Sequence, residues 1–163
     1  ISSNNELFVF VGEKKTGDNS KTNILHCYRI STGELLWEIT LPMSELQFRN
    51  GDKIVSGVTN GPNPDLVQIN AITGEILKST SLYGLGDFNQ VTTSVDGSSY
   101  FFAKTGAQKI LEYTYPDGAQ KRSMDGAEDI ITVLESLPGG EFLISGSFNG
   151  AIQLWDLTQD QYV

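Results

Sequence analysis

Three carboxylates lie close together in the stretch 125–129, which reads Asp-Gly-Ala-Glu-Asp. Carboxylate oxygens are the ligands that Ca²⁺ prefers, so Asp125, Glu128 and Asp129 form the chain's main candidate for a metal site. A dedicated calcium loop places its ligands at alternating positions, and this stretch does not. The sequence therefore favours an exposed acidic turn that links two structural elements.

The only histidine, His26, stands next to the only cysteine, Cys27, inside the apolar run 24–30. Nucleophilic catalysis would need a serine or cysteine in a turn beside a base, and a strand position does not offer this. Cys27 is therefore predicted to be a small buried hydrophobic residue. A lone cysteine forms no internal disulfide, which favours a reducing compartment, and we expect a cytoplasmic protein.

Two further patterns could carry chemistry and are better explained by structure. The segment 84–87, Gly-Leu-Gly-Asp, is too short for a phosphate loop and lies in no strand-to-helix context. Glu34 and Glu75 recur within Thr-Gly-Glu triplets, so a role in turns is favoured over an acid/base pair. The sequence thus predicts no catalytic, cofactor-binding or metal-binding residue, and no cofactor.

The triplets belong to an internal repeat. Thr32-Gly33-Glu34 returns as Thr73-Gly74-Glu75, and turn residues follow again at 116–118 and near 158–160. Short apolar runs bounded by such turns indicate strands. A period of roughly 40–45 residues with four short strands is typical of a β-propeller blade. The chain is therefore predicted to be all-β, built from blades of four antiparallel strands.

The predicted organisation is one propeller segment with units at about 1–43, 44–86, 87–126 and 127–163. The first unit lacks its first strand, and residues 12–23 are expected to form a long hairpin loop. The expected strands are 6–11, 24–30, 34–40, 45–48, 53–58, 65–70, 75–80, 88–94, 99–104, 108–115, 119–123, 130–136, 141–146, 151–156 and a stub at 161–163. About four blades are few for a closed ring, so a partial ring is expected. Further blades of the same chain or a partner subunit would complete it.

Charge and hydropathy limit the possible partners. The formal net charge of −9 argues against direct nucleic-acid binding, which needs clustered Lys and Arg. The pairs Lys14-Lys15 and Lys121-Arg122 are expected in loops as solvated charges. No apolar run reaches the length of a membrane span, and the start of the sequence has no signal-peptide pattern.

The segment 146–157, Gly-Ser-Phe-Asn-Gly-Ala-Ile-Gln-Leu-Trp-Asp-Leu, resembles the core of a WD-repeat blade. The resemblance implies structural roles for Gly146, Gly150, Trp155 and Asp156. WD-repeat blades often add a Gly-His pair and an Asp in the hairpin turn. Here no Gly precedes His26, and Asn149 stands where that Asp is usual, so stability is expected to come from stacking. The Thr-Gly-Glu turns, followed by Leu-Leu-Trp-Glu at 35–38, are also similar to quinoprotein-type repeats.

These resemblances imply a non-catalytic scaffold for protein–protein interactions, not an enzyme, with other proteins as partners. Loops on a rigid frame are the usual sites of recognition. The candidate contact regions are 12–23, Gly57–Asp65, Ser81–Asp87 and Asp125–Asp129. One alternative is a quinoprotein-like propeller, either an enzyme domain or a periplasmic or outer-membrane assembly factor. The other is a ligand-sensing propeller domain.

Overall fold

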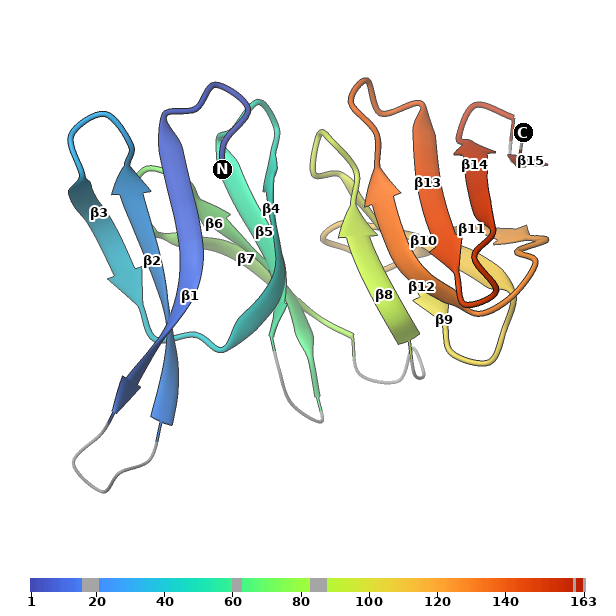
Figure 1. The fold of residues 1–163 in the computed structure, drawn as a ribbon, viewed down its shortest axis with the longest axis horizontal. Coiled ribbons are helices and arrows are strands. Elements are labelled where there is room, and N and C mark those ends of the chain that lie inside the picture. The colour runs from blue at the N-terminus through green and yellow to red at the C-terminus, as the bar shows by residue number, and fades with distance from the viewer. Residues whose placement is uncertain (16–20, 60–62, 83–87, 160, 163) are drawn as a thin grey trace. The chain divides into compact units, whose positions relative to one another are not determined.

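The computed structural model describes residues 1–15, 21–59, 63–82, 88–159 and 161–162 (Figure 1). In these residues the chain is all-β, as predicted, and every sheet is antiparallel. No helix of the described residues is long and apolar enough to cross a membrane.

The strands form sheets in which neighbours along the chain are neighbours in space. Sheet 1 contains β1 (Leu7–Lys15), β2 (Lys21–Arg29) and β3 (Glu34–Ile39). Sheet 2 contains β4 (Met43–Arg49), β5 (Ile54–Thr59), β6 (Asp65–Asn70) and β7 (Ile76–Ser81). Sheet 3 contains β8 (Phe88–Thr93), β9 (Ser99–Lys104), β10 (Lys109–Thr114) and β11 (Gln120–Asp125). Sheet 4 contains β12 (Ile131–Ser136), β13 (Phe142–Ser147), β14 (Ile152–Asp156) and β15 (Gln161–Tyr162).

Sheet 1 has one strand fewer than the others, in agreement with the repeat analysis. The predicted long loop at 12–23 is wrong, because β1 runs to Lys15 and β2 begins at Lys21. Glu13 and Lys21, on the described parts of these strands, are more than half exposed, and Lys21 Nζ lies 2.6 Å from Glu13 Oε2. A strand exposed on both sides needs no alternating apolar residues, so its sequence cannot be told from that of a loop.

Two compact units divide the chain, Ile1–Tyr83 and Gly84–Val163. In the first unit, one face of sheet 1 packs on sheet 2 and β1 lies beside β4. The buried side chains of this core are Leu7, Leu25, Cys27, Trp37, Met43, Val55, Val67, Ile69 and Ala71. Residues at alternate strand positions share a face, so this core follows from the two-residue period of the strands.

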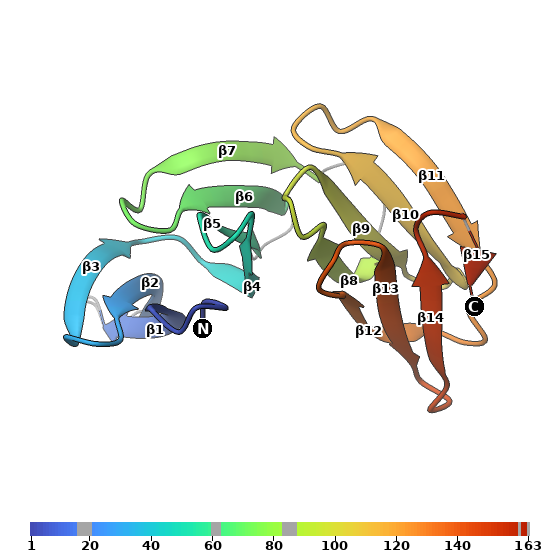
Figure 2. The same cartoon turned by 90° about the horizontal axis from the view of Figure 1, so that it is seen from above.

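In the second unit, sheet 4 packs on sheet 3 and β12 lies beside β8 (Figure 2). The core side chains are Phe101, Ala103, Ile110, Met124, Ala127, Ile131, Leu134, Leu143 and Trp155. Ser136 Oγ also donates a hydrogen bond of 2.6 Å to the Thr93 carbonyl oxygen of β8, across the two sheets. Each unit is thus a pair of sheets stacked face to face over a shared apolar layer.

Candidate interaction surfaces

Trp155 of the WD-repeat-like segment lies at the centre of the second unit. Its side chain is fully buried, and its indole Nε1–H donates a hydrogen bond of 2.9 Å to Ser145 Oγ on the neighbouring strand. Ser145 is buried as well. A buried indole N–H needs an acceptor, and the hydroxyl provides one inside the same sheet. This position leaves Trp155 inaccessible to a ligand.

Asp156 follows on β14 and closes the turn after it. Its Oδ1 accepts hydrogen bonds from the Thr158 hydroxyl and the Thr158 amide, at 2.6 and 2.7 Å. These two bonds, the hydroxyl bond first, hold the pKa of Asp156 below its ordinary value. The carboxylate is therefore occupied by its own turn.

The two glycines of the motif differ in local geometry. Gly150 adopts φ +88°, where residues with a Cβ are strained, and it ends the turn that Ser147 begins. Asn149 Oδ1 accepts a hydrogen bond of 2.9 Å from the Ala151 amide, so the amide side chain caps this turn. Gly146 is paired between Val133 and Ile152 on the adjacent strands. The four motif residues all occupy structural positions, and their role in blade stability stays a prediction.

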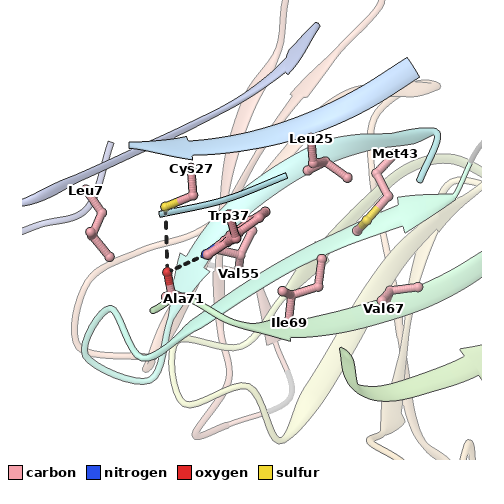
Figure 3. Packing of buried hydrophobic residues seen from close by; sticks show 9 residues of the cluster. All are labelled: Leu7, Leu25, Cys27, Trp37, Met43, Val55, Val67, Ile69 and Ala71. Carbon is pink, nitrogen blue, oxygen red and sulfur yellow. Dashed lines mark hydrogen bonds between the residues drawn. The ribbon is translucent and has the colours of Figure 1, made fainter. Parts of the chain in front are cut away.

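A second tryptophan joins the two sheets of the first unit (Figure 3). Trp37 on β3 donates a hydrogen bond of 3.0 Å from Nε1 to the carbonyl oxygen of Ala71, which follows β6. A Cβ at Gly74 would lie 2.7 Å from Trp37 Cγ, which is closer than atoms can approach, so the indole rests directly on the glycine backbone. Gly74 is therefore required both for its φ of +74° and for this contact.

Cys27 points to the same carbonyl oxygen, with its Sγ 3.6 Å from Ala71 O (Figure 3). Burial raises the pKa of the thiol to about 11, while the nearby Arg29 acts in the opposite direction. A thiol held protonated in an apolar core is a poor nucleophile. The prediction of a buried, structural Cys27 is confirmed.

The acidic turn is held by side-chain amides. Gln153 Oε1 accepts from the Glu128 amide at 3.0 Å, and Gln153 Nε2 donates to the Gly126 carbonyl oxygen at 3.0 Å. Asp129 Oδ1 accepts from the Ile130 amide, and Asp125 Oδ2 from the Ser123 hydroxyl. In the part of the chain described, no three carboxylate, His or Cys residues are grouped so that they could hold a metal.

The basic pair Lys121-Arg122 was expected as solvated charges in a loop; the loop is wrong for both, and the solvated charge is wrong for Arg122, whereas Lys121 is half exposed. Both residues lie on β11 and form ion pairs with Glu112 of β10, Lys121 at 2.9 Å and Arg122 through Nε. Glu112 is only 2% exposed. Arg122 also donates a hydrogen bond of 2.7 Å to the carbonyl oxygen of Leu157, in the turn after β14. A buried carboxylate needs such partners. In the sequence, the position of Glu112 between apolar strand residues could have indicated that it is buried and paired. The other pair, Lys14-Lys15, also lies on a strand, at the end of β1.

The face of sheet 1 that points away from sheet 2 carries a ladder of rings, which we call the Phe8 face. It consists of Phe8, Phe10, His26 and Tyr28. The rings of Phe8 and Phe10 are 5.4 Å apart, and those of Phe10 and His26 are 5.1 Å apart. Phe8 is 41% exposed. His26 Nδ1 also lies 3.5 Å from Glu38 Oε2 of β3. The imidazole thus contacts both a ring of the Phe8 face and a carboxylate on the neighbouring strand.

Sheet 4 has a corresponding uncovered surface, the Ile152 face, made of Ile130, Val133, Phe148 and Ile152. The side chains of Phe148 and Ile152 are 80% and 75% exposed. Val133 and Ile152 flank Gly146, and together they present an apolar strip on the side of the sheet opposite its core. Exposed, contiguous apolar side chains of this kind mark interaction sites.

Solved structures share this arrangement of stacked antiparallel sheets. The chain is similar to the β-propeller domain of Cps50 (Swd1) from Myceliophteria thermophila, with a TM-score of 0.64 over 91% of this chain. The chain has the β-propeller fold. The sequence identity to that domain is 11%, and the match spans about half (51%) of the other chain. No family model and no curated protein matches the sequence.

The sheets are therefore propeller blades, and the predicted fold class is confirmed. The predicted interaction loops cannot be described in full, whereas the blade faces can. The segment Gly57–Asp65 includes residues 60–62, and Ser81–Asp87 includes 83–87, which lie outside the described residues, as do 16–20 of the hairpin. The Gly-Leu-Gly-Asp segment at 84–87 falls in the same gap. The two uncovered faces were not among the predicted contact regions, although Phe8 and Phe10 stand at alternate positions of one strand.

Proposed function

We propose that this chain is a non-catalytic interaction platform whose propeller blades bind other proteins. The observation that carries the proposal is the pair of uncovered apolar surfaces, the Phe8 face and the Ile152 face. A propeller blade is normally covered on both sides, so each face is suited to receive another β-sheet. Apolar surface of this kind drives association when it is removed from water.

The polar groups of the described blades support a structural role for the chain. Glu112 is neutralised by two basic residues, Cys27 is buried and protonated, and Trp155 is enclosed in its own sheet. Each of these groups is engaged in packing, a hydrogen bond or an ion pair within or between the blades. The net charge of −9 favours partners with basic surfaces.

We further propose that the blades described here form part of a larger ring. The similar β-propeller domain is about twice as long as the matched region, which supports additional blades beyond the four units. These blades would come from further sequence or from a partner subunit. A reducing compartment such as the cytoplasm is the proposed location, because Cys27 is the only cysteine and is kept as a thiol.

The proposal is tested by placing a charge on one blade face. Ile152→Asp should lower the recovery of captured partner proteins by at least about tenfold, because a carboxylate cannot be buried there without a partner charge. Ile76→Asp is the matched control, since Ile76 is also an exposed isoleucine on a strand, at 49% exposure. The readout is affinity capture followed by native mass spectrometry, with circular dichroism to verify folding.

Equal recovery by the wild type, Ile152→Asp and a second variant, Phe8→Asp, would contradict the proposal. Loss in the control Ile76→Asp as well would also contradict it, because binding would then not depend on the uncovered faces.

A further inference from the structure

The first blade contains an unfilled copy of the site that receives Trp37 in the second blade. In the second blade, the indole of Trp37 lies on Gly74 and donates to the Ala71 carbonyl oxygen. The repeat of 41 residues that relates Gly33 to Gly74 also relates Ile30 to Ala71. The first blade therefore contains the same turn one repeat earlier.

The two turns are built by matching hydrogen bonds. The Gly33 amide donates to Arg29 O at 2.9 Å, as the Gly74 amide donates to Asn70 O at 2.9 Å. The Ile30 amide donates to Glu6 O at 2.9 Å, and the Ala71 amide donates to Lys53 O at 3.0 Å. Within the triplets, the third-residue amide donates to the threonine hydroxyl at 3.3 Å in both blades. Gly33 and Gly74 have φ values of +70° and +74°.

The strands beside the turns match as well. The cross-strand pair Val55–Ile69 of sheet 2 corresponds to Phe8–Tyr28 of sheet 1, and Gly57–Val67 corresponds to Phe10–His26. Val55, Val67 and Ile69 are the positions through which sheet 2 packs on sheet 1. The Phe8 face thus occupies the positions at which a blade contacts the blade before it.

What differs is the space above the turn. Apart from its neighbours in the chain, no atom of the described residues would lie within 4 Å of a Cβ at Gly33, whereas a Cβ at Gly74 would collide with the Trp37 ring. A pocket of about 450 Å³ opens here, lined by Ile1, Phe8, Tyr28, Arg29, Ile30 and Gly33. Its lining is apolar, and its volume is in the range of sites that bind small ligands or large side chains.

We propose that this pocket is a docking site for a tryptophan side chain presented by a partner β-sheet that stacks on the Phe8 face. The indole ring lies against Gly33, and its N–H donates to the Ile30 carbonyl oxygen, as Trp37 does to Ala71. The proposal rests on the interaction platform proposed above and specifies what its first blade recognises.

A second copy of this chain does not meet the requirement. The sequence contains two tryptophans, and both are already placed, Trp37 at 7% exposure and Trp155 at 0%. The indole must therefore come from a sheet outside these 163 residues.

The test uses the 163-residue chain and 3-methylindole, which is the tryptophan side chain itself. Titration followed by ¹H–¹⁵N NMR should shift the amide signals of Ile30, Ser31 and Gly33 in a saturable way. The analogue 1,3-dimethylindole has no N–H, so it should bind at least about fivefold more weakly, as expected for one lost hydrogen bond. Toluene, the phenylalanine side chain, should also bind more weakly than 3-methylindole.

Ile30→Asp should abolish the saturable shifts, because it places a carboxylate in the apolar lining. Ile72→Asp is the matched control, since Ile72 is an exposed isoleucine in the equivalent turn of the second blade and should leave binding unchanged. Shifts elsewhere, no saturation, or equal affinity for the two indoles would overturn the proposal. If partner capture still depends on Ile152 in that case, the interaction platform stands and only the tryptophan site is rejected.

Discussion

At the scale of single residues, this protein uses its reactive side chains to build structure. Cys27, His26 and Glu112 carry side chains of the types that act as nucleophiles, bases or acids in enzymes. Cys27 lies in the core of the first unit, His26 stacks between aromatic rings, and Glu112 is neutralised by Lys121 and Arg122. Their places on strands explain why these side chains are packed, stacked or paired: each strand position faces either a packed layer or a side chain on the neighbouring strand.

The thiol of Cys27 gives a prediction about alkaline pH. Its pKa is raised from 9.0 to about 11 in the folded chain, so below pH 9 both the folded and the unfolded thiol are protonated. Between pH 9 and 11 the unfolded thiol loses its proton while the folded one does not. The free energy of unfolding should therefore fall over this window, by at most ~1.4 kcal/mol per pH unit.

Urea unfolding at a series of pH values measures this effect, with Cys27→Ala as the comparison. The variant should show a shallower decline than the wild type between pH 9 and 11. A residual slope is expected from Tyr100, whose pKa burial also raises. Identical slopes in the two proteins would show that the thiol is not responsible.

At the scale of elements, the joining of one blade to the next depends on tryptophan and glycine together. The Trp37 indole spans from β3 to the turn after β6, and Gly74 leaves the space that the ring needs. The same turn at Gly33 has the backbone conformation without the ring. Substitutions at Gly33 and Gly74 can therefore separate two costs in stability: that of a side chain at positive φ, and that of displacing the Trp37 ring.

Gly33→Ala should destabilise the chain by about 1–2 kcal/mol, the cost of an L-residue at positive φ. Gly74→Ala has the same backbone cost and also displaces the indole, so it should destabilise by a further ~1–3 kcal/mol. Chemical denaturation of both variants gives the difference. Equal losses would mean that the indole contact adds nothing to stability.

At the scale of the whole molecule, the proposed function gives the net negative charge and the apolar faces separate roles. Under the proposed function, the net charge of −9 would act at a distance on an approaching partner, while the Phe8 and Ile152 faces would act only on contact. Long-range charge changes the rate of encounter, and buried apolar contact changes the lifetime of the complex.

The association rate constant with a captured basic partner should therefore fall by about tenfold between 50 and 500 mM salt. The dissociation rate constant should change little over the same range. Biosensor measurements at several salt concentrations separate the two constants. If the dissociation rate carried the salt effect, ion pairs within the interface would dominate instead.

The sequence by itself determined the class of fold and most strand positions, because turn residues and short apolar runs recur with a fixed period. Thr-Gly-Glu at 32–34 and 73–75 could be recognised as turns, since those residue types carry their local geometry with them. The sequence could not separate loop from strand at 12–23, because strand residues 13–15 and 21 are exposed and no apolar alternation is required there.

Only the tertiary structure decided which face each alternating position joins and what lies above each turn. Phe8 and Leu7 are both apolar strand residues, yet Leu7 is buried against the second sheet and Phe8 stays exposed. Gly33 and Gly74 have the same neighbours in sequence, and a ring fills one site while the other is open. Local sequence sets the conformation of a turn. Whether a ring fills the space above the turn depends on the side chains that another sheet brings there when it stacks.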